Sequence, residues 1–104
     1  MYKKYSIELK RIGEVLARKY KPEKVIVFGS YASNKIHKWS DLDIVVVKNT
    51  KKRFADRIEE VIGLVKPKEA TDFLVYTPSE FAEMAKNNYF IRDEVLKKGQ
   101  VIYG

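Results

Sequence analysis

The sequence predicts an α+β fold in which a small mixed β-sheet packs against helices as two layers. Amphipathic helical segments alternate with short apolar segments rich in β-branched residues, which is typical of buried strands. The middle helix is long enough to cross over between parallel strands, whereas the link before it is too short for a helical crossover. A mixed sheet of three to four strands follows from these observations.

The length and composition fit one compact domain, which we expect to span residues 1–104. Hydrophobic residues make up 45% of the chain, enough for a core. Lys and Arg outnumber Asp and Glu by 21 to 14, giving a net charge of +7. This charge favours phosphate-bearing ligands or an acidic partner, although a solvated surface would explain it equally well.

The residue types restrict the metals and the cellular location. The chain has no cysteine and one histidine, so any metal must be held by carboxylates, which favours Mg²⁺ or Mn²⁺. No apolar segment is long enough to span a bilayer, and the N-terminus does not resemble a signal peptide. We therefore expect a cytoplasmic protein that does not contact membranes.

The first half of the chain predicts a helix followed by two strands. Apolar residues recur at steps of three and four over residues 3–20, which predicts an amphipathic helix ended by a Lys-Pro pair. Residues 24–28 are almost all apolar and predict a strand buried on both faces. A Gly-Ser break and one helical turn follow, and residues 42–47 predict the second strand. These two strands should be antiparallel because their link is short.

Residues 51–65 predict the crossover helix, and residues 70–76 predict a third strand parallel to the second. The apolar side of the helix consists of Phe54, Ile58, Val61, Ile62 and Val65. Because the second and third strands are parallel and consecutive, we expect them to be neighbours in the sheet.

The last part of the chain predicts two helices and a short strand. Residues 77–80 can form a capping box, with a proline at the first helical position. The Asn pair at residues 87–88 should interrupt that helix, and Gly99 should cap the end of the next one. Residues 101–103 predict an edge strand. The overall order is α-β-turn-β-α-β-α-α.

Three aspartates are candidates for a metal site. Asp41 and Asp43 are two apart at a strand start, so their side chains point to the same face. Asp72 lies near the start of the neighbouring strand and can reach the same place. Adjacent carboxylates repel each other unless a cation lies between them, and a pair of divalent ions is the usual clamp for phosphoryl transfer. Taken singly, each aspartate could equally be an ordinary exposed residue.

The Gly29-Ser30 break is a candidate phosphate site. Glycine allows an anion to approach the backbone closely, and the free N–H groups and the serine hydroxyl are donors. On its own, a Gly-Ser pair is usually just a turn. Its combination with the three aspartates is what favours a triphosphate-binding site.

These motifs resemble the signature of the DNA polymerase β-like nucleotidyltransferase superfamily. Residues 28–32 (FGSYA) are followed, ten residues after the serine, by residues 40–44 (SDLDI). The resemblance continues through residues 71–77 (TDFLVYT), where the family has its third carboxylate, to residues 90–99 (FIRDEVLKKG). It covers essentially the whole chain. The chain most resembles the minimal nucleotidyltransferases that are encoded beside HEPN-domain proteins.

The resemblance implies a reaction in which a nucleoside monophosphate, most simply AMP from ATP, is transferred to a hydroxyl group with release of pyrophosphate. It implies two Mg²⁺ ions and a HEPN-type ribonuclease toxin as the acceptor, with this chain as its antitoxin. The implied nucleotide-binding residues are Gly29, Ser30 and Ser40, and the implied metal-binding and catalytic residues are Asp41, Asp43 and Asp72.

One departure from the family pattern lies after the Gly-Ser turn. The family usually has Arg and then Gly where this chain has Ser33 and Asn34. Asn tolerates positive φ, so the turn can survive, but a phosphate-facing cation is missing. Lys35 or Lys38 are the candidates to replace it. Trp39, in the same loop, is expected to close the loop onto the core.

Two other functions stay open at this point. The chain could neutralise its partner by contact alone, with a vestigial nucleotide site, or it could modify an antibiotic or an RNA end. The last is the weakest because the chain lacks the extra domain that would grip such acceptors, and we expect no direct binding of nucleic acid. A partly uncovered sheet in so small a domain favours association, as a homo- or hetero-oligomer.

Overall fold

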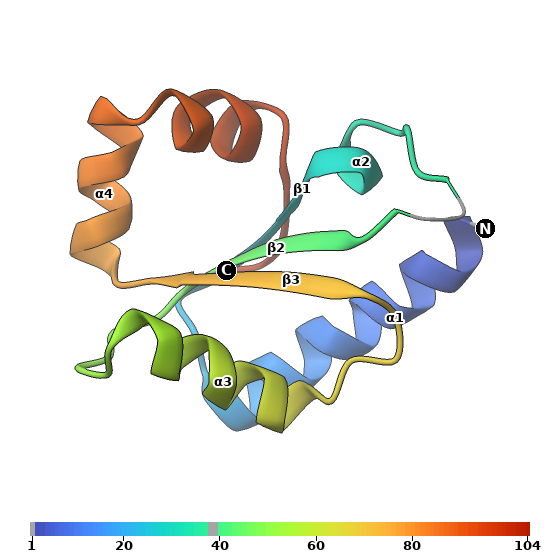
Figure 1. Cartoon of the computed structure of the whole chain (residues 1–104), viewed down its shortest axis with the longest axis horizontal. Helices are drawn as coiled ribbons and strands as arrows, with labels where there is room; N and C mark the ends of the chain where they lie inside the picture. Colours follow the sequence, from blue (N-terminus) through green and yellow to red (C-terminus); the bar gives the residue numbers. More distant parts are fainter. Residues whose placement is uncertain (1, 38–39) are drawn as a thin grey trace.

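A four-stranded mixed sheet lies between two layers of helices (Figure 1). This confirms the predicted α+β fold with a mixed sheet, whereas the expected two layers are three, because helices cover both faces of the sheet. The computed structural model describes residues 2–37 and 40–104. The strand order is β3-β2-β1-β4, with β2 and β3 parallel and the other two pairs antiparallel. The strands are β1 (Lys24–Phe28), β2 (Leu42–Val47), β3 (Thr71–Tyr76) and β4 (Gln100–Tyr103). The helices are α1 (Tyr2–Val15), α2 (Gly29–Ala32), α3 (Phe54–Val65) and α4 (Pro78–Asn87), with π-helical segments η1 (Leu16–Tyr20) and η2 (Phe90–Lys97).

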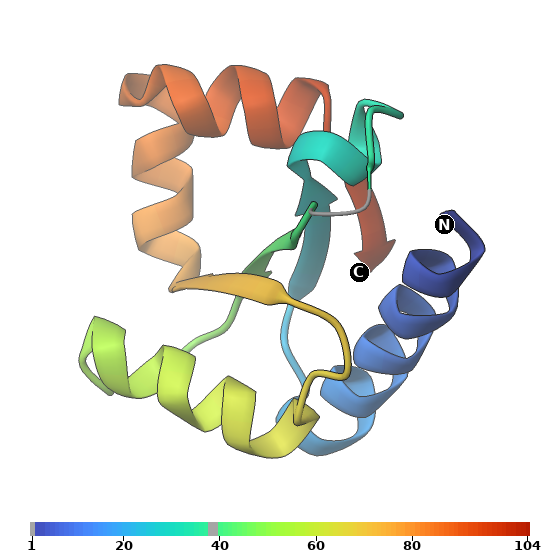
Figure 2. The ribbon, with the colours of Figure 1, turned by 45° about the vertical axis from the view of Figure 1, so that its right-hand side comes forward.

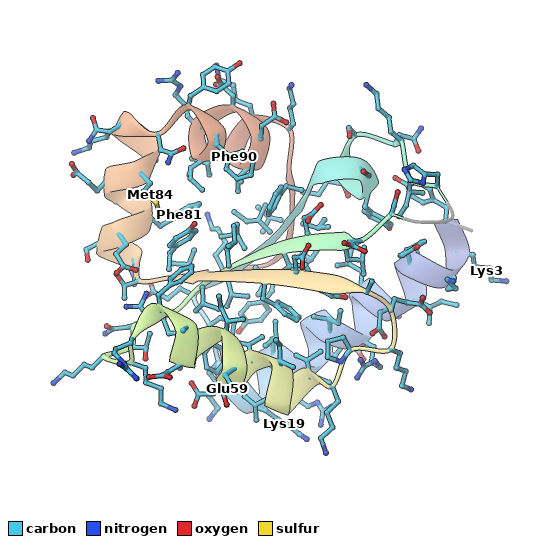
Figure 3. All side chains as sticks on the ribbon, viewed as in Figure 1. Lys3, Lys19, Glu59, Phe81, Met84 and Phe90 are labelled. Atoms are coloured by element: carbon cyan, nitrogen blue, oxygen red, sulfur yellow. The ribbon has the colours of Figure 1, made fainter. Side chains whose placement is uncertain are left out.

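Each face of the sheet has its own core because successive strand residues point to opposite faces. Ile44 belongs to the core under α1 and α3, whereas its neighbour Val45 belongs to the core under α4 and η2. Figure 2 shows α1 and α3 together on one side of the sheet and α4 with η2 on the other. Phe81 and Met84 of α4, labelled in Figure 3, pack against the second core.

The first helix follows the predicted apolar pattern but ends in a wider, π-helical turn. The predicted apolar stripe of α1 and η1 is buried, with exposures of 5% or less at Tyr5, Leu9, Ile12, Leu16 and Tyr20. The last turn is π-helical, and Lys21, at φ 52°, ends the helix with its N–H donated to the Leu16 carbonyl.

No helix within the described ranges has both the length and the apolar character that a bilayer-spanning segment requires.

The apolar side that the sequence predicts for α3 is only partly buried. Val61 and Val65 lie in the core, whereas Phe54 and Ile62 are 41% and 44% exposed. The sheet ends at β3, so this flank of the helix extends past the last strand and stays partly exposed. The periodicity could not reveal where the sheet would stop.

The predicted capping box at the start of α4 is present. The Thr77 hydroxyl accepts a hydrogen bond from the Glu80 N–H at 3.2 Å, and the Glu80 carboxylate accepts one from the Thr77 N–H at 2.8 Å. The same carboxylate accepts from the buried Arg57 guanidinium at 2.7 Å. Arg57 also donates to the Val75 carbonyl at 3.2 Å. Arg57 therefore joins α3, the end of β3 and α4.

Gly99 follows η2 as predicted, but its role differs from that of a left-handed helix cap. The described glycines with positive φ are Gly29 and Gly104. A Cβ at Gly99 would lie 2.2 Å from the Val95 carbonyl oxygen and 2.9 Å from Cγ2 of Ile26. The glycine is thus required because the chain passes very close to η2 and β1 as it enters β4. The predicted edge strand is confirmed and begins one residue earlier, at Gln100.

Candidate active site

The candidate site lies where β1 ends and where β2 and β3 begin. Phe28 is the register partner of Asp43 across the β1–β2 pair, and Asp43 is the register partner of Asp72 across the β2–β3 pair. Neighbouring strands are about 4.8 Å apart, so Asp43 and Asp72 are adjacent and point to the same face. The structure therefore brings together two of the three predicted carboxylates.

Gly29 contacts the central carboxylate of this row. Its φ is 73°, in the left-handed region, and a Cβ at this position would lie 2.3 Å from Oδ2 of Asp43. Any other residue would collide with the carboxylate or strain the backbone. The glycine bend and the aspartate are thus parts of one site, as the sequence predicts.

The carboxylate of Asp43 is partly buried and lies close to two other carboxylates. Burial, and to a smaller extent the nearby carboxylates of Asp72 and Asp41, together raise the pKa of its carboxyl group from 3.8 to about 6. Asp41 lies just before β2 and is exposed, but it is near enough to act on Asp43. A bound cation would relieve this repulsion.

The two predicted serines are placed differently. Ser30 lies in the first turn of α2, half-buried, next to Gly29. Ser40 is 7% exposed, and its hydroxyl accepts a hydrogen bond from the His37 N–H at 2.9 Å. The Ser40 carbonyl accepts another from the Tyr5 hydroxyl at 2.8 Å. Ser40 thus holds the loop before Asp41 against α1, a structural role beside the predicted one.

The turn after α2 keeps its shape without the family's Arg and Gly. Asn34 has a φ of 60°, which confirms that it can replace a glycine there. The Ser33 hydroxyl donates to the Gly29 carbonyl at 2.8 Å, so it closes the turn and cannot supply a positive charge. Lys35 is exposed. The other predicted replacement, Lys38, and the loop residue Trp39 lie outside the described residues.

The carboxylate oxygens of the described site suit Mg²⁺, although they do not by themselves form a complete metal-binding site. Among the described residues, no group of three His, Asp or Glu side chains is arranged so that it could hold a metal ion. Mg²⁺ usually binds through one or two carboxylates together with water and substrate phosphates, and hard carboxylate oxygens are its preferred protein ligands. The adjacent Asp43 and Asp72, with their unneutralised charge, fit that requirement.

A hollow of about 540 Å³ extends from the carboxylates around the edge of β3. Its walls include Asp43 and Asp72, Ile58 and Ile62 of α3, and Phe90 of η2. Phe90, labelled in Figure 3, makes an edge-to-face contact with Phe28 at 5.4 Å between ring centroids. The sequence pattern did not identify these apolar residues as part of a site. The one available signal was an apolar side of residues 51–65 too wide for burial against a single strand.

Comparison with known proteins places the chain in a family. The profile described as "Polymerase beta, Nucleotidyltransferase" matches residues 10–104 and so includes the glycine bend and all three aspartates. No curated protein is significantly similar to the chain. The family match agrees with the site geometry described above and with a role in nucleotidyl transfer. The chain therefore belongs to the polymerase β nucleotidyltransferase family.

Proposed function

We propose that this protein is a Mg²⁺-dependent nucleotidyltransferase that transfers AMP from ATP to a hydroxyl group of a partner protein. The observation that carries the proposal is the pairing of Asp43 with Asp72 beside the Gly29 bend, in a chain of this family. Two adjacent carboxylates next to a glycine turn match the two needs of the reaction, which are metal binding and close approach of a polyphosphate.

Each residue has a defined part in the transfer. Gly29 and Ser30 lie against the β- and γ-phosphates. Asp41, Asp43 and Asp72 would hold the metal, which would supply charge neutralisation along the polyphosphate. Asp72 takes up the proton of the acceptor hydroxyl. The acceptor oxygen bonds to the α-phosphorus while the bond from this phosphorus to the bridging oxygen breaks, and pyrophosphate leaves with the bonding electrons. Positioning and electrostatics supply most of the rate.

The resemblance to minimal nucleotidyltransferases identifies the partner in this proposal. The acceptor is a HEPN-type toxin encoded beside this chain, and its modification makes this chain an antitoxin. The sheet has two edge strands, β3 and β4, with which a partner could associate. The net charge of +7 favours an acidic partner.

The test is transfer of label from α-labelled ATP to the neighbour-encoded protein in the presence of Mg²⁺. We expect labelling by the wild type and at least a hundredfold loss, on the order expected for a catalytic carboxylate, in Asp43→Ala and Asp72→Ala. Asp56→Ala is the matched control, because Asp56 is a partly exposed acid on α3 that pairs with Arg53 and does not line the site. Label transfer that survives in Asp43→Ala would refute the proposed site.

A second function is favoured by Ser33. The hydroxyl of this residue closes the turn where the family has a phosphate-facing cation, so triphosphate affinity is expected to be lower. On this alternative the chain silences its partner by binding alone. The double variant Asp41→Ala/Asp43→Ala would then still bind and silence the toxin, whereas loss of silencing with binding retained would reject the alternative.

A further inference from the structure

The free edge of β3 lies on the opposite side of the carboxylates from the glycine bend. The strand order places β3 at the end of the sheet, with β2 as its one neighbour. Across the sheet, Gly29 follows β1, Asp43 lies on β2 and Asp72 lies on β3. In-line displacement requires the attacking and leaving oxygens to be on opposite sides of the phosphorus. With the triphosphate at Gly29, the acceptor therefore arrives over the edge of β3.

The backbone of this edge is open at one short stretch. The carbonyls of Ala70 and Tyr76 accept hydrogen bonds from β2, each at 2.9 Å. Because strand residues alternate, the even-numbered residues of β3 bond to β2, and the odd-numbered ones turn their N–H and C=O groups outward. The outward carbonyl of Val75 already accepts from Arg57. This leaves the outward groups of Thr71 and Phe73, on either side of Asp72.

The hollow along this edge has a distinct chemical character. It combines two carboxylates with apolar side chains of α3 and η2, and none of the described residues that line it is a Lys, Arg or His. This contrasts with a chain that carries 21 Lys and Arg residues. Such a surface repels a phosphodiester backbone and suits a neutral or basic peptide with apolar side chains.

We propose that the acceptor binds as an extended peptide segment that pairs with β3 at Thr71–Phe73 and places its hydroxyl-bearing side chain beside Asp72. Addition of a strand to an exposed sheet edge is a general mode of peptide recognition, in which backbone hydrogen bonds give affinity and side-chain pockets give specificity. The inference rests on the proposed function and deepens it, because it assigns the acceptor's conformation and its neighbouring residues.

The pairing fixes the pattern of the acceptor sequence. The residue opposite Asp72 has its side chain on the same face as the aspartate, where the hydroxyl can lose its proton to the carboxylate as its oxygen bonds to the α-phosphorus. The residues before and after it point to the other face, toward Ile58 and Ile62. The acceptor is therefore a hydroxyl residue with apolar neighbours. We take the pairing to be antiparallel, so the N–H groups of those neighbours point at Thr71 and Phe73 of β3, whereas the N–H of the hydroxyl residue points away.

The probe is the blocked peptide Lys-Val-Tyr-Val-Lys, with serine and threonine versions, incubated with α-labelled ATP and Mg²⁺. We expect AMP to be transferred to at least one version. Methylation of either valine nitrogen should abolish the transfer, and methylation of the central nitrogen should leave it nearly unchanged. Ile62→Glu should raise KM for the peptide about tenfold, which corresponds to roughly 1.4 kcal/mol. Ile7→Glu is the matched control, since Ile7 is 62% exposed on α1.

Water also attacks ATP slowly and yields AMP and pyrophosphate. This hydrolysis distinguishes a failure of the docking inference from a failure of the proposed function. If this hydrolysis proceeds and no peptide is labelled, the docking inference is overturned and the proposed function stands. Equal KM values for Ile62→Glu and Ile7→Glu, equal effects of the three methylations, or labelling of an RNA oligonucleotide in place of the peptide would overturn it as well. Absence of both hydrolysis and transfer would overturn the proposed function itself.

Discussion

A Cβ atom at Gly29 would lie 2.3 Å from Oδ2 of Asp43, so the bend after β1 and the central carboxylate on β2 occupy one continuous space. The contact follows from the register in which Phe28 is opposite Asp43. The contact packs the phosphate-facing turn at Gly29 directly against the carboxylate of Asp43.

Gly29→Ala should therefore lose both stability and activity. The left-handed φ of 73° and the clash with the carboxylate together are expected to cost about 1–3 kcal/mol of unfolding free energy. Urea unfolding and label transfer measure the two effects. Gly63→Ala is the control, because nothing lies within 4 Å of a Cβ there and alanine favours the helix by about 0.5–1 kcal/mol. A Gly29→Ala variant as stable and active as the wild type would contradict the contact.

Removing the charge of Asp43 should stabilise the protein at high pH. In the folded state its pKa is raised from 3.8 to about 6, so the native protein binds the proton more tightly than the unfolded chain. Stability therefore falls as the pH rises from about 4 to about 6. We expect Asp43→Asn to exceed the wild type by about 1–3 kcal/mol at pH 8, less where solvent screens the charge. The gap should narrow as the pH falls below 6 and close as it reaches about 4.

Asp93→Asn gives a control of opposite sign. Burial alone would raise the pKa of Asp93, but the hydrogen bonds and positive charges of Arg92 and Lys97 together lower it. This carboxylate therefore stabilises the native protein when it is charged, and its replacement should lower stability at pH 8. Chemical denaturation at both pH values separates the two variants. A wild type that exceeds Asp43→Asn in stability at pH 8 would show that the carboxylate is not strained by its neighbours.

Mg²⁺ should stabilise the nucleotide-free wild type. An ion bound to Asp43 and Asp72 adds RT ln(1 + [Mg²⁺]/Kd) to the unfolding free energy, or about 2.7 kcal/mol at a hundredfold excess over Kd. A rise in Tm with added Mg²⁺ that is absent in Asp43→Asn and Asp72→Asn is the expected result. Chelation with EDTA should reverse the rise. An equal rise in all three proteins would assign the effect to other carboxylates.

The local sequence determines much of this site, whereas its surroundings depend on distant contacts. Strand parity and the crossover helix between β2 and β3 were enough to predict that Asp43 and Asp72 would be adjacent. Asn34 was expected to take a left-handed conformation and does so. The exposure of Ile62 could not be predicted, because it depends on β3 being the last strand. Likewise, the need for glycine at residue 99 arises from Ile26 of β1, far away in the sequence.

The carboxylate of Glu8 supports the site from the opposite layer. It is 4% exposed and accepts hydrogen bonds from Arg11 Nε at 2.7 Å and from the Lys68 N–H at 2.6 Å. The Glu69 N–H also donates to it, at 3.4 Å. These bonds fix the loop that leads into β3 and hence the position of Asp72.

Glu8→Gln should cost about 2–3 kcal/mol at pH 7, because its amide group would turn donors toward donors in a buried place. Burial alone would raise the pKa of Glu8, but the bonds from Arg11 and from the Lys68 N–H lower it below 4.5. The stabilisation is therefore present above pH 4.5 and is lost as the pH falls through the folded-state pKa. Glu69→Gln, at the partly exposed ion pair with Lys4, should change stability by less than about 1 kcal/mol. Unfolding curves at pH 7 and pH 3 test both variants, and a Glu8→Gln deficit that persists unchanged at pH 3 would contradict the charge-assisted role of this residue.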